Sequence, residues 1–403
     1  MMRSIELFAG AGGLALGTAL SGFHTVLAAE LDRWACNTLE NNRDRGYPLL
    51  KDLVVRRGDV RKMDFSEYEG TIDLLTGGPP CQPFSIGGKH QAHQDDRDMF
   101  SEYARVLAQL KPKAFIIENV RGLTRDSFTN YLNYIENCMT APEISRQPDE
   151  TWEMHSERLT ECLTSTASLG VRYVIERQVY NAANFGAPQK RERVFIVGFR
   201  SDQDAKWHWP KHTHSQDELI RSQWITGEYW DRHNVPARLR PVMPGGLKRK
   251  TEQLRAVNGH AQTSPWQTVR DALIGLPEPT VDSKRNSSVY DHRLQPGARS
   301  YTGHTGSPLD LPSKALKAGD HGVPGGENMV VLPDGSVRYF TIREAARLQT
   351  FPDGYVFDGA WSEAMRQIGN AVPVVLAQAI VSSVAEKLCE ASIRREIKKR
   401  RMQ

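Results

Sequence analysis

The sequence has few cysteines, no long apolar run and little net charge. Its five cysteines are widely separated and none forms a CxxC pair, which excludes a disulfide framework and gives no zinc signature. We find no run of 18 or more apolar residues and no signal peptide, so we expect no membrane span and a reducing, cytoplasmic setting. Because Lys+Arg 52 against Asp+Glu 48 leave a formal net charge of only +4, any contact with nucleic acid must come from local patches.

What is present is the ordinary composition of a globular protein, with 39% hydrophobic and 25% charged residues in a chain of 403. That length predicts two or three domains. Over the first two hundred residues, short apolar runs alternate with amphipathic stretches, which is typical of an α/β fold with a doubly wound, mostly parallel sheet. Strands are predicted at 4–9, 25–30, 72–76, 114–118, 174–179 and 193–199, and helices at 14–21 and 99–110.

The composition changes near residue 200, where Trp, Pro, Gly and His become frequent and helical periodicity fades. We therefore predict a smaller, irregular, β-rich domain over 200–360, inserted into a first domain made of 1–199 and 361–403. A long helix is expected over 371–388, and a surface insertion over 140–156. The basic stretch 394–401 (RREIKKRR) is read either as a solvated helix end or as a DNA phosphate contact.

A glycine-rich turn, FAGAGG at 8–13, lies between the first predicted strand and helix. Glycines let the backbone turn tightly and approach a ligand closely. Glu30 ends the next strand and can accept hydrogen bonds from ribose hydroxyls, and Asp59 lies in a third turn. The pattern predicts a nucleotide-like cofactor site, and a purely structural glycine turn is the alternative.

The strongest chemical signal is GGPPCQPFS at 77–85, which follows the predicted strand 72–76. It places Cys81 at the carboxyl edge of the sheet, where such folds bind ligands. Glu118 and Asn119 end another strand, and a carboxyl in that position is costly unless it has a partner or a role. Asn119 can tether neighbouring backbone. The run QKRER at 189–193 offers cations beside the same edge, and a solvated charge cluster is the alternative.

These segments resemble the DNA (cytosine-5)-methyltransferase family of bacterial type. The motifs FAGAGG, GGPPCQPFS, ENV, QKRERVFIVG, REAARLQTFP and QIGNAVP all occur in order. The resemblance is weakest over 200–337, the variable target-recognition region. One departure lies there, because the family usually has a Thr-Leu or Thr-Ile pair where this chain has Ala315-Leu316.

The resemblance implies transfer of a methyl group from S-adenosylmethionine to carbon 5 of a cytosine flipped out of duplex DNA, leaving S-adenosylhomocysteine. The catalytic residues would be Cys81, Glu118 and Arg193. The Cys81 thiolate would add to carbon 6 of the base. Glu118, in a pocket dry enough to raise its pKa, would steady ring nitrogen 3, and Arg193 would hold the base carbonyl. No metal is expected.

The family's cofactor-binding positions correspond here to Phe8, Ala9, Gly10, Gly12, Gly13, Glu30, Leu31, Asp59, Val60, Pro80, Asn370, Ala371 and Val372. DNA contacts are predicted for Gln82, Ser85, Lys89, Arg97 and Arg191, and the polar segment 85–100 is read as a loop that closes over the flipped base.

We expect a monomer on double-stranded DNA, with restriction or phage-defence proteins as partners. A tRNA cytosine-5 methyltransferase of the same fold and a catalytically silent DNA-binding homologue are the alternatives. The large inserted region argues against the first, and the intact Cys81, Glu118 and Arg193 argue against the second.

Overall fold

The computed structural model describes residues 1–80, 99–165, 170–256, 262–281, 289–318 and 328–402. Within these residues the chain forms two compact units. Unit 1 consists of Met1–Tyr180, Glu192–Pro210 and Ala377–Gln403, and unit 2 of Asn181–Arg191 and Lys211–Leu376.

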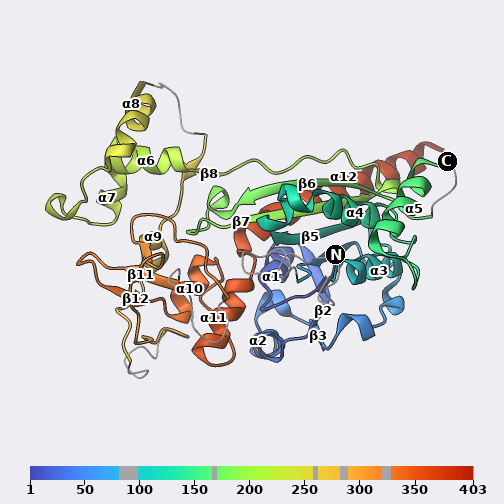
Figure 1. Cartoon of the computed structure of the whole chain (residues 1–403), viewed down its shortest axis with the longest axis horizontal. Coiled ribbons are helices and arrows are strands. Elements are labelled where there is room, and N and C mark those ends of the chain that lie inside the picture. The colour runs from blue at the N-terminus through green and yellow to red at the C-terminus, as the bar shows by residue number, and fades with distance from the viewer. Residues whose placement is uncertain (81–98, 166–169, 257–261, 282–288, 319–327, 403) are drawn as a thin grey trace. The chain divides into compact units, whose positions relative to one another are not determined.

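A seven-stranded sheet forms the centre of unit 1 (Figure 1). Its strands lie in the order β3-β2-β1-β4-β5-β7-β6. The first five are parallel to their neighbours, and β7 is antiparallel to β5. The predicted α/β fold with a mostly parallel sheet is thus confirmed. The strands are β1 (Met2–Leu7), β2 (Phe23–Glu30), β3 (Val54–Arg57), β4 (Leu74–Gly77), β5 (Ala114–Val120), β6 (Tyr173–Asn181) and β7 (Glu192–Arg200).

The helices predicted at 14–21, 99–110 and 371–388 correspond to three of the helices of unit 1, of which the last extends to Met402. The helices of unit 1 are α1 (Gly13–Leu20), α2 (Arg33–Asp44), α3 (Phe100–Leu110), α4 (Thr129–Thr140), α5 (Trp152–Thr164) and most of α12 (Val374–Met402). Ile5 and Leu7 of β1 pack in one buried cluster with Leu107 of α3 and Ile135 of α4. The hydroxyl of Tyr103 donates to the carbonyl of Leu75 at 3.0 Å, which ties α3 to the middle of the sheet.

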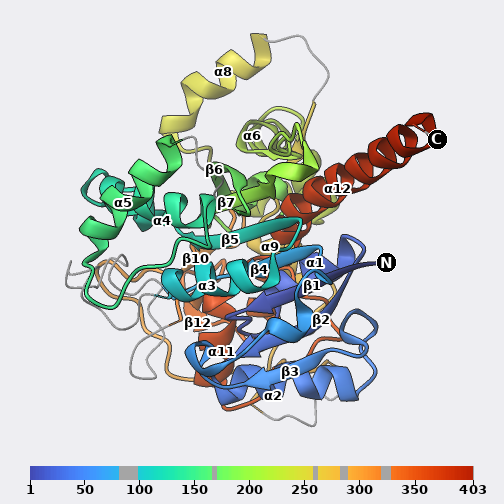
Figure 2. The same ribbon diagram turned by 90° about the vertical axis from the view of Figure 1, so that its right-hand side faces the viewer.

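The strand order reverses beside β1. From β1 the chain proceeds outward to β2 and β3, and then returns to place β4 and β5 on the other side of β1 (Figure 2). In open α/β sheets, ligands bind at the carboxyl ends of the strands at such a reversal. Two of the predicted motifs occupy this point, because 8–13 follows β1 and 78–80 follows β4.

Unit 2 is built from short elements. Its helices are α6 (Gln216–Trp224), α7 (Glu228–Arg232), α8 (Lys248–Ala256), α9 (Val269–Leu273), α10 (Ile342–Leu348) and α11 (Trp361–Asn370). Its strands are β8 (His214–Ser215), β9 (Ser264–Pro265), β10 (Ser307–Pro308), β11 (Met329–Val331) and β12 (Val337–Tyr339), in one three-stranded and one two-stranded sheet. The irregular character predicted for 200–360 is present. Its described part is less β-rich than predicted, because its Trp and Tyr side chains pack between short helices such as α6 and α7.

One helical stretch of the described residues, Trp361–Arg400, would suffice to cross a membrane by length and composition, because an 18-residue window within it has a mean hydropathy of 1.7. A core helix of a soluble protein passes the same test, and 61% of that window is buried. Ile380, Val381 and Val384 of α12 are fully buried. Burial inside the protein accounts for the apolar composition of this helix.

Candidate active site

Glu118 and Arg193 form a buried ion pair at the end of two adjacent strands. β5 and β7 pair antiparallel, with Val120 opposite Arg193. This register brings the Nε of Arg193 to 2.8 Å from Oε1 of Glu118, with side-chain exposures of 14% and 9%. Burial lowers the pKa of the Arg193 guanidinium, and the Glu118 carboxylate opposes that shift. Two of the three residues predicted to be catalytic are therefore in direct contact.

The turn after β4 leads the chain to these two residues. The side-chain amide of Asn119 donates to the carbonyl of Pro79 at 3.0 Å, which confirms the tether predicted for Asn119. A Cβ on Gly78 would lie 3.1 Å from Oε2 of Glu118, so the absent side chain leaves room for the carboxylate. Sequence reasoning did not identify this contact, although the position of Gly78 in the GGPP segment was a signal for it.

Five predicted residues lie outside the described part of the chain. They are the nucleophile candidate Cys81 and the predicted DNA contacts Gln82, Ser85, Lys89 and Arg97. The loop predicted over 85–100 falls there too, except for its last two residues. The first described range of the chain ends at Pro80, which is exposed and immediately precedes Cys81.

The turn after β1 has three residues with positive φ: Phe8 (55°), Gly10 (52°) and Gly12 (84°). At Gly10 the backbone N–H donates to Oε2 of Glu30 at 2.7 Å. A Cβ on Gly10 would meet no atom within 4 Å, so the need for glycine here comes from the left-handed backbone. This hydrogen bond ties the glycine turn to Glu30 at the end of β2.

The carboxylate of Glu30 is fixed by three backbone amides. Besides Gly10, the N–H groups of Leu31 and Asp32 both donate to Oε1 at 2.8 Å. Burial raises the pKa of Glu30, and these hydrogen bonds oppose the shift. Leu31 beside it is 66% exposed. An oriented acceptor next to an open glycine turn and an uncovered apolar side chain suits a nucleoside, with its ribose hydroxyls and flat base.

Two further predicted cofactor residues lie in the turn after β3. Asp59 caps this turn by accepting from the backbone N–H of Arg61 at 3.0 Å and pairs with the Arg61 guanidinium at 2.6 Å. This partner lowers the pKa of Asp59. Val60 is buried, and its carbonyl accepts from Arg105 at 2.8 Å.

Four further predicted residues belong to unit 2. Asn370 is exposed at the end of α11, and Ala371 and Val372 are buried directly after it. Arg191 is only 1% exposed, and its guanidinium donates to the carbonyls of Leu316 and Gly369. That burial favours a structural role for Arg191 over the DNA contact predicted from the sequence.

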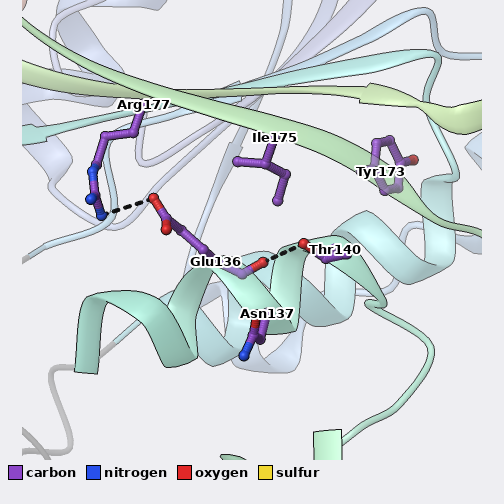
Figure 3. A pocket seen from close by; sticks show the side chains of 6 residues that line it. All are labelled: Glu136, Asn137, Thr140, Tyr173, Ile175 and Arg177. Carbon is purple, nitrogen blue, oxygen red and sulfur yellow. Dashed lines mark hydrogen bonds and ion pairs between the residues drawn. The ribbon is translucent and has the colours of Figure 1, made fainter. Parts of the chain in front are cut away.

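A cavity of about 460 Å³ lies elsewhere in unit 1, between α4 and β6 (Figure 3). Glu136 and Arg177 form an ion pair of 3.0 Å on its wall, and Asn137, Thr140, Tyr173 and Ile175 complete the lining. None of the predicted site residues that the structure describes lines it. Among the described residues, no group of three or more His, Cys, Asp or Glu side chains is placed to hold a metal ion.

Comparison with known proteins identifies the family. A model of the C-5 cytosine-specific DNA methylases matches residues 2–141 and 153–386. The chain belongs to this family. The family's members use S-adenosylmethionine as methyl donor, and the protein is a DNA (cytosine-5-)-methyltransferase.

Similar proteins extend over nearly the whole chain. The type II methyltransferase M.Eco47II of Escherichia coli is 34% identical over 388 residues, which cover 95% of this chain and 79% of the relative. M.NgoMIV of Neisseria gonorrhoeae is 30% identical, covering 96% of this chain and 97% of the relative. The crystal structure of the Schizosaccharomyces pombe (S. pombe) Dnmt2 methyltransferase shares the fold at 16% identity, with a TM-score of 0.55 over 96% of this chain and 98% of that chain.

Proposed function

We propose that the protein methylates carbon 5 of a flipped-out cytosine in a specific duplex sequence through a covalent adduct with Cys81. The observation that carries this proposal is the buried Glu118–Arg193 pair, packed against Gly78 in the turn that leads into Cys81. A nucleophile at this position would meet a base already held by a carboxyl and a guanidinium.

In the proposed reaction, the Cys81 thiolate attacks carbon 6, and the electron pair of the 5,6 double bond becomes available at carbon 5. Glu118, protonated or sharing a proton, steadies ring nitrogen 3, and Arg193 donates to the base carbonyl as negative charge develops on the ring. The two side chains need little reorganisation, because their ion pair already fixes them. Carbon 5 would take the methyl group of S-adenosylmethionine, whose sulfur–methyl bond breaks to leave S-adenosylhomocysteine. Loss of the carbon 5 proton to a base would then re-form the 5,6 double bond and expel the Cys81 thiolate.

S-adenosylmethionine supplies the methyl group. We propose that Phe8, Ala9, Gly10, Gly12 and Gly13 line the first turn of its site. Glu30 would orient its ribose, Leu31 would cover one face of its adenine, and Asp59 and Val60 would flank the adenine edge. The proposal extends to Pro80, Asn370, Ala371 and Val372, the further positions that match the family's motifs.

We also propose that residues 200–360 recognise the target DNA sequence, while 1–199 and 361–403 form the domain that binds S-adenosylmethionine and catalyses methyl transfer. Side chains that contact base edges each contribute about 1–3 kcal/mol of discrimination against the wrong base. Contacts to phosphates increase the affinity for DNA but add little sequence specificity. Polar substitutions within 200–337 should therefore alter which site is methylated, or weaken DNA binding, and leave the affinity for S-adenosylmethionine nearly unchanged.

The type II names of the relatives fit a restriction-modification system. We propose such a system, or a phage-defence system, as the setting, with the enzyme acting as a monomer on cytoplasmic DNA. Bisulfite sequencing of DNA from cells that express the protein would identify the methylated sequence.

The decisive test is duplex DNA with 5-fluorocytosine at the methylated position. Fluorine cannot leave as a cation, so the step that frees Cys81 is blocked and a denaturant-resistant adduct should accumulate with S-adenosylmethionine. Cys81→Ala should form no adduct and transfer no methyl group, while still binding cofactor and DNA. Methylation of tRNA in place of duplex DNA, or retention of a tenth of the wild-type rate by Cys81→Ala, would refute the proposal.

A further inference from the structure

Four buried polar side chains of unit 2 bind the main chain of two separate segments, 316–318 and 368–371. They are Gln189, Arg191, Asn328 and Gln349, each exposed by no more than 1%. A buried polar group must be hydrogen-bonded to avoid a large desolvation cost. Here the partners are backbone groups, so the conformation of both segments depends on these side chains.

Arg191 joins the two segments directly. One terminal nitrogen of its guanidinium donates to the carbonyl of Leu316 at 3.0 Å, and the other donates to the carbonyl of Gly369 at 2.7 Å. A guanidinium is planar and presents several donors in a fixed fork, so one side chain can hold two carbonyls in a set geometry.

The neighbouring contacts fix the same segments from other sides. Leu316 donates its N–H to Oε1 of Gln189 at 3.0 Å. The side-chain amide of Asn328 bonds both the N–H and the carbonyl of Lys317, at 3.1 and 3.0 Å. The amide of Gln349 donates to the carbonyls of Ile368 and Ala371 at 2.7 and 3.3 Å.

Gly369 shows how closely the two segments approach. A Cβ at this position would lie 2.4 Å from the backbone nitrogen of Ala318, so no side chain fits there. Arg191 therefore binds the carbonyl of a residue, Gly369, that is itself in close contact with the segment 316–318. The two segments form one assembly, with the Arg191 cation between their carbonyls.

We propose that Arg191 is a positioning residue that sets the conformation of the 369–372 segment, and through it the affinity for S-adenosylmethionine. This inference rests on the proposed function, in which Asn370, Ala371 and Val372 contact the cofactor. Arg191 itself need not touch cofactor or DNA. The same contacts fix Leu316, next to the position where Ala315 departs from the family pattern, so the backbone there is held without the missing hydroxyl.

The test compares Arg191→Met with Arg343→Met in the full-length protein. Arg343 is a matched control, because it is also fully buried in unit 2 and its guanidinium also donates to backbone carbonyls, those of Tyr290, Pro352 and Tyr355. The carboxylate of Asp291 lies 3.8 Å from it. Calorimetry with S-adenosylmethionine gives the dissociation constant, thermal unfolding gives the stability, and methyl transfer to duplex DNA gives KM and kcat.

Both variants should lower the melting temperature. Only Arg191→Met should weaken cofactor binding, by about tenfold or more, with a matching rise in KM for the cofactor and a smaller change in kcat. Arg191→Lys should restore the affinity in part, because one ammonium keeps the charge but cannot reproduce the fork. Arg191→Lys also serves as the test if Arg191→Met does not fold.

An affinity of the Arg191 variants within twofold of wild type would overturn the inference, as would an equal loss of affinity in Arg343→Met. Failure of the wild-type protein to bind S-adenosylmethionine would instead refute the proposed function. The two failures are therefore distinguished by the wild-type measurement.

Discussion

The Glu118–Arg193 pair should be one of the strongest single polar interactions in unit 1. Its nitrogen–oxygen distance is 2.8 Å, which corresponds to an attraction of about 6 kcal/mol at an effective dielectric constant of about 20. Desolvation of the two charged groups offsets much of this energy. Removing one partner leaves the other buried and unpaired, so Glu118→Gln and Arg193→Met should each lower the free energy of unfolding by about 3–5 kcal/mol.

A double-mutant cycle measured by chemical denaturation isolates the pair. The double variant should be destabilised by less than the sum of the single variants, because neither charge is then left unpaired. The control is Arg121→Met, since Arg121 pairs with Glu192 of the same strand β7 but with side-chain exposures of 63% and 44%. That substitution should cost no more than about 1 kcal/mol. Single-variant costs as small as the control's would refute the reasoning.

Three further predictions concern individual residues. Glu30→Gln turns an amide N–H₂ toward backbone donors, so it should weaken S-adenosylmethionine binding by about tenfold or more in calorimetry, and an unchanged affinity would contradict the role of Glu30. Gly78→Ala places a methyl group 3.1 Å from Oε2 of Glu118, and should reduce the methyl-transfer rate without changing cofactor affinity; a wild-type rate would show that the carboxylate is free to move. Nδ1 of His155 forms a hydrogen bond of 3.0 Å with the hydroxyl of Tyr134, and burial lowers the pKa of His155. Because the fold favours neutral His155, its stabilising contribution is complete above a pH of about 6.5 and is lost as the pH falls toward the lower folded pKa. Thermal unfolding of His155→Gln across this range should show a weaker pH dependence than wild type, and equal dependence would rule out this titration.

Much of the fold could be read from local patterns. The strands and helices of unit 1 depend on apolar periodicity and on glycine turns, which are properties of neighbouring residues. Strands 4–9 and 25–30 and helices 14–21 and 99–110 were therefore predicted close to their observed bounds. The insertion predicted over 140–156 was right only in part, because α5 begins at Trp152 and the side chain of its residue His155 is buried. The family model nevertheless omits 142–152.

Residue identity by itself also determined which chemistry to look for. The order of GGPPC, ENV and the glycine turn, and their position directly after strands, predicted the nucleophile, the carboxyl and the cofactor site. What the sequence could not decide is which side chains meet across long separations. Glu118 and Arg193 are brought together by the antiparallel register of β5 and β7, a pairing that no local pattern encodes.

Arg191 shows the same limit most clearly. In the sequence it is one of several cations in QKRER and is indistinguishable from Arg193 by composition. In the tertiary structure, Arg193 reaches a carboxylate, whereas Arg191 reaches carbonyls 125 and 178 residues away. Burial and the direction of each side chain separate a proposed catalytic arginine from a proposed positioning arginine, and both are consequences of long-range packing.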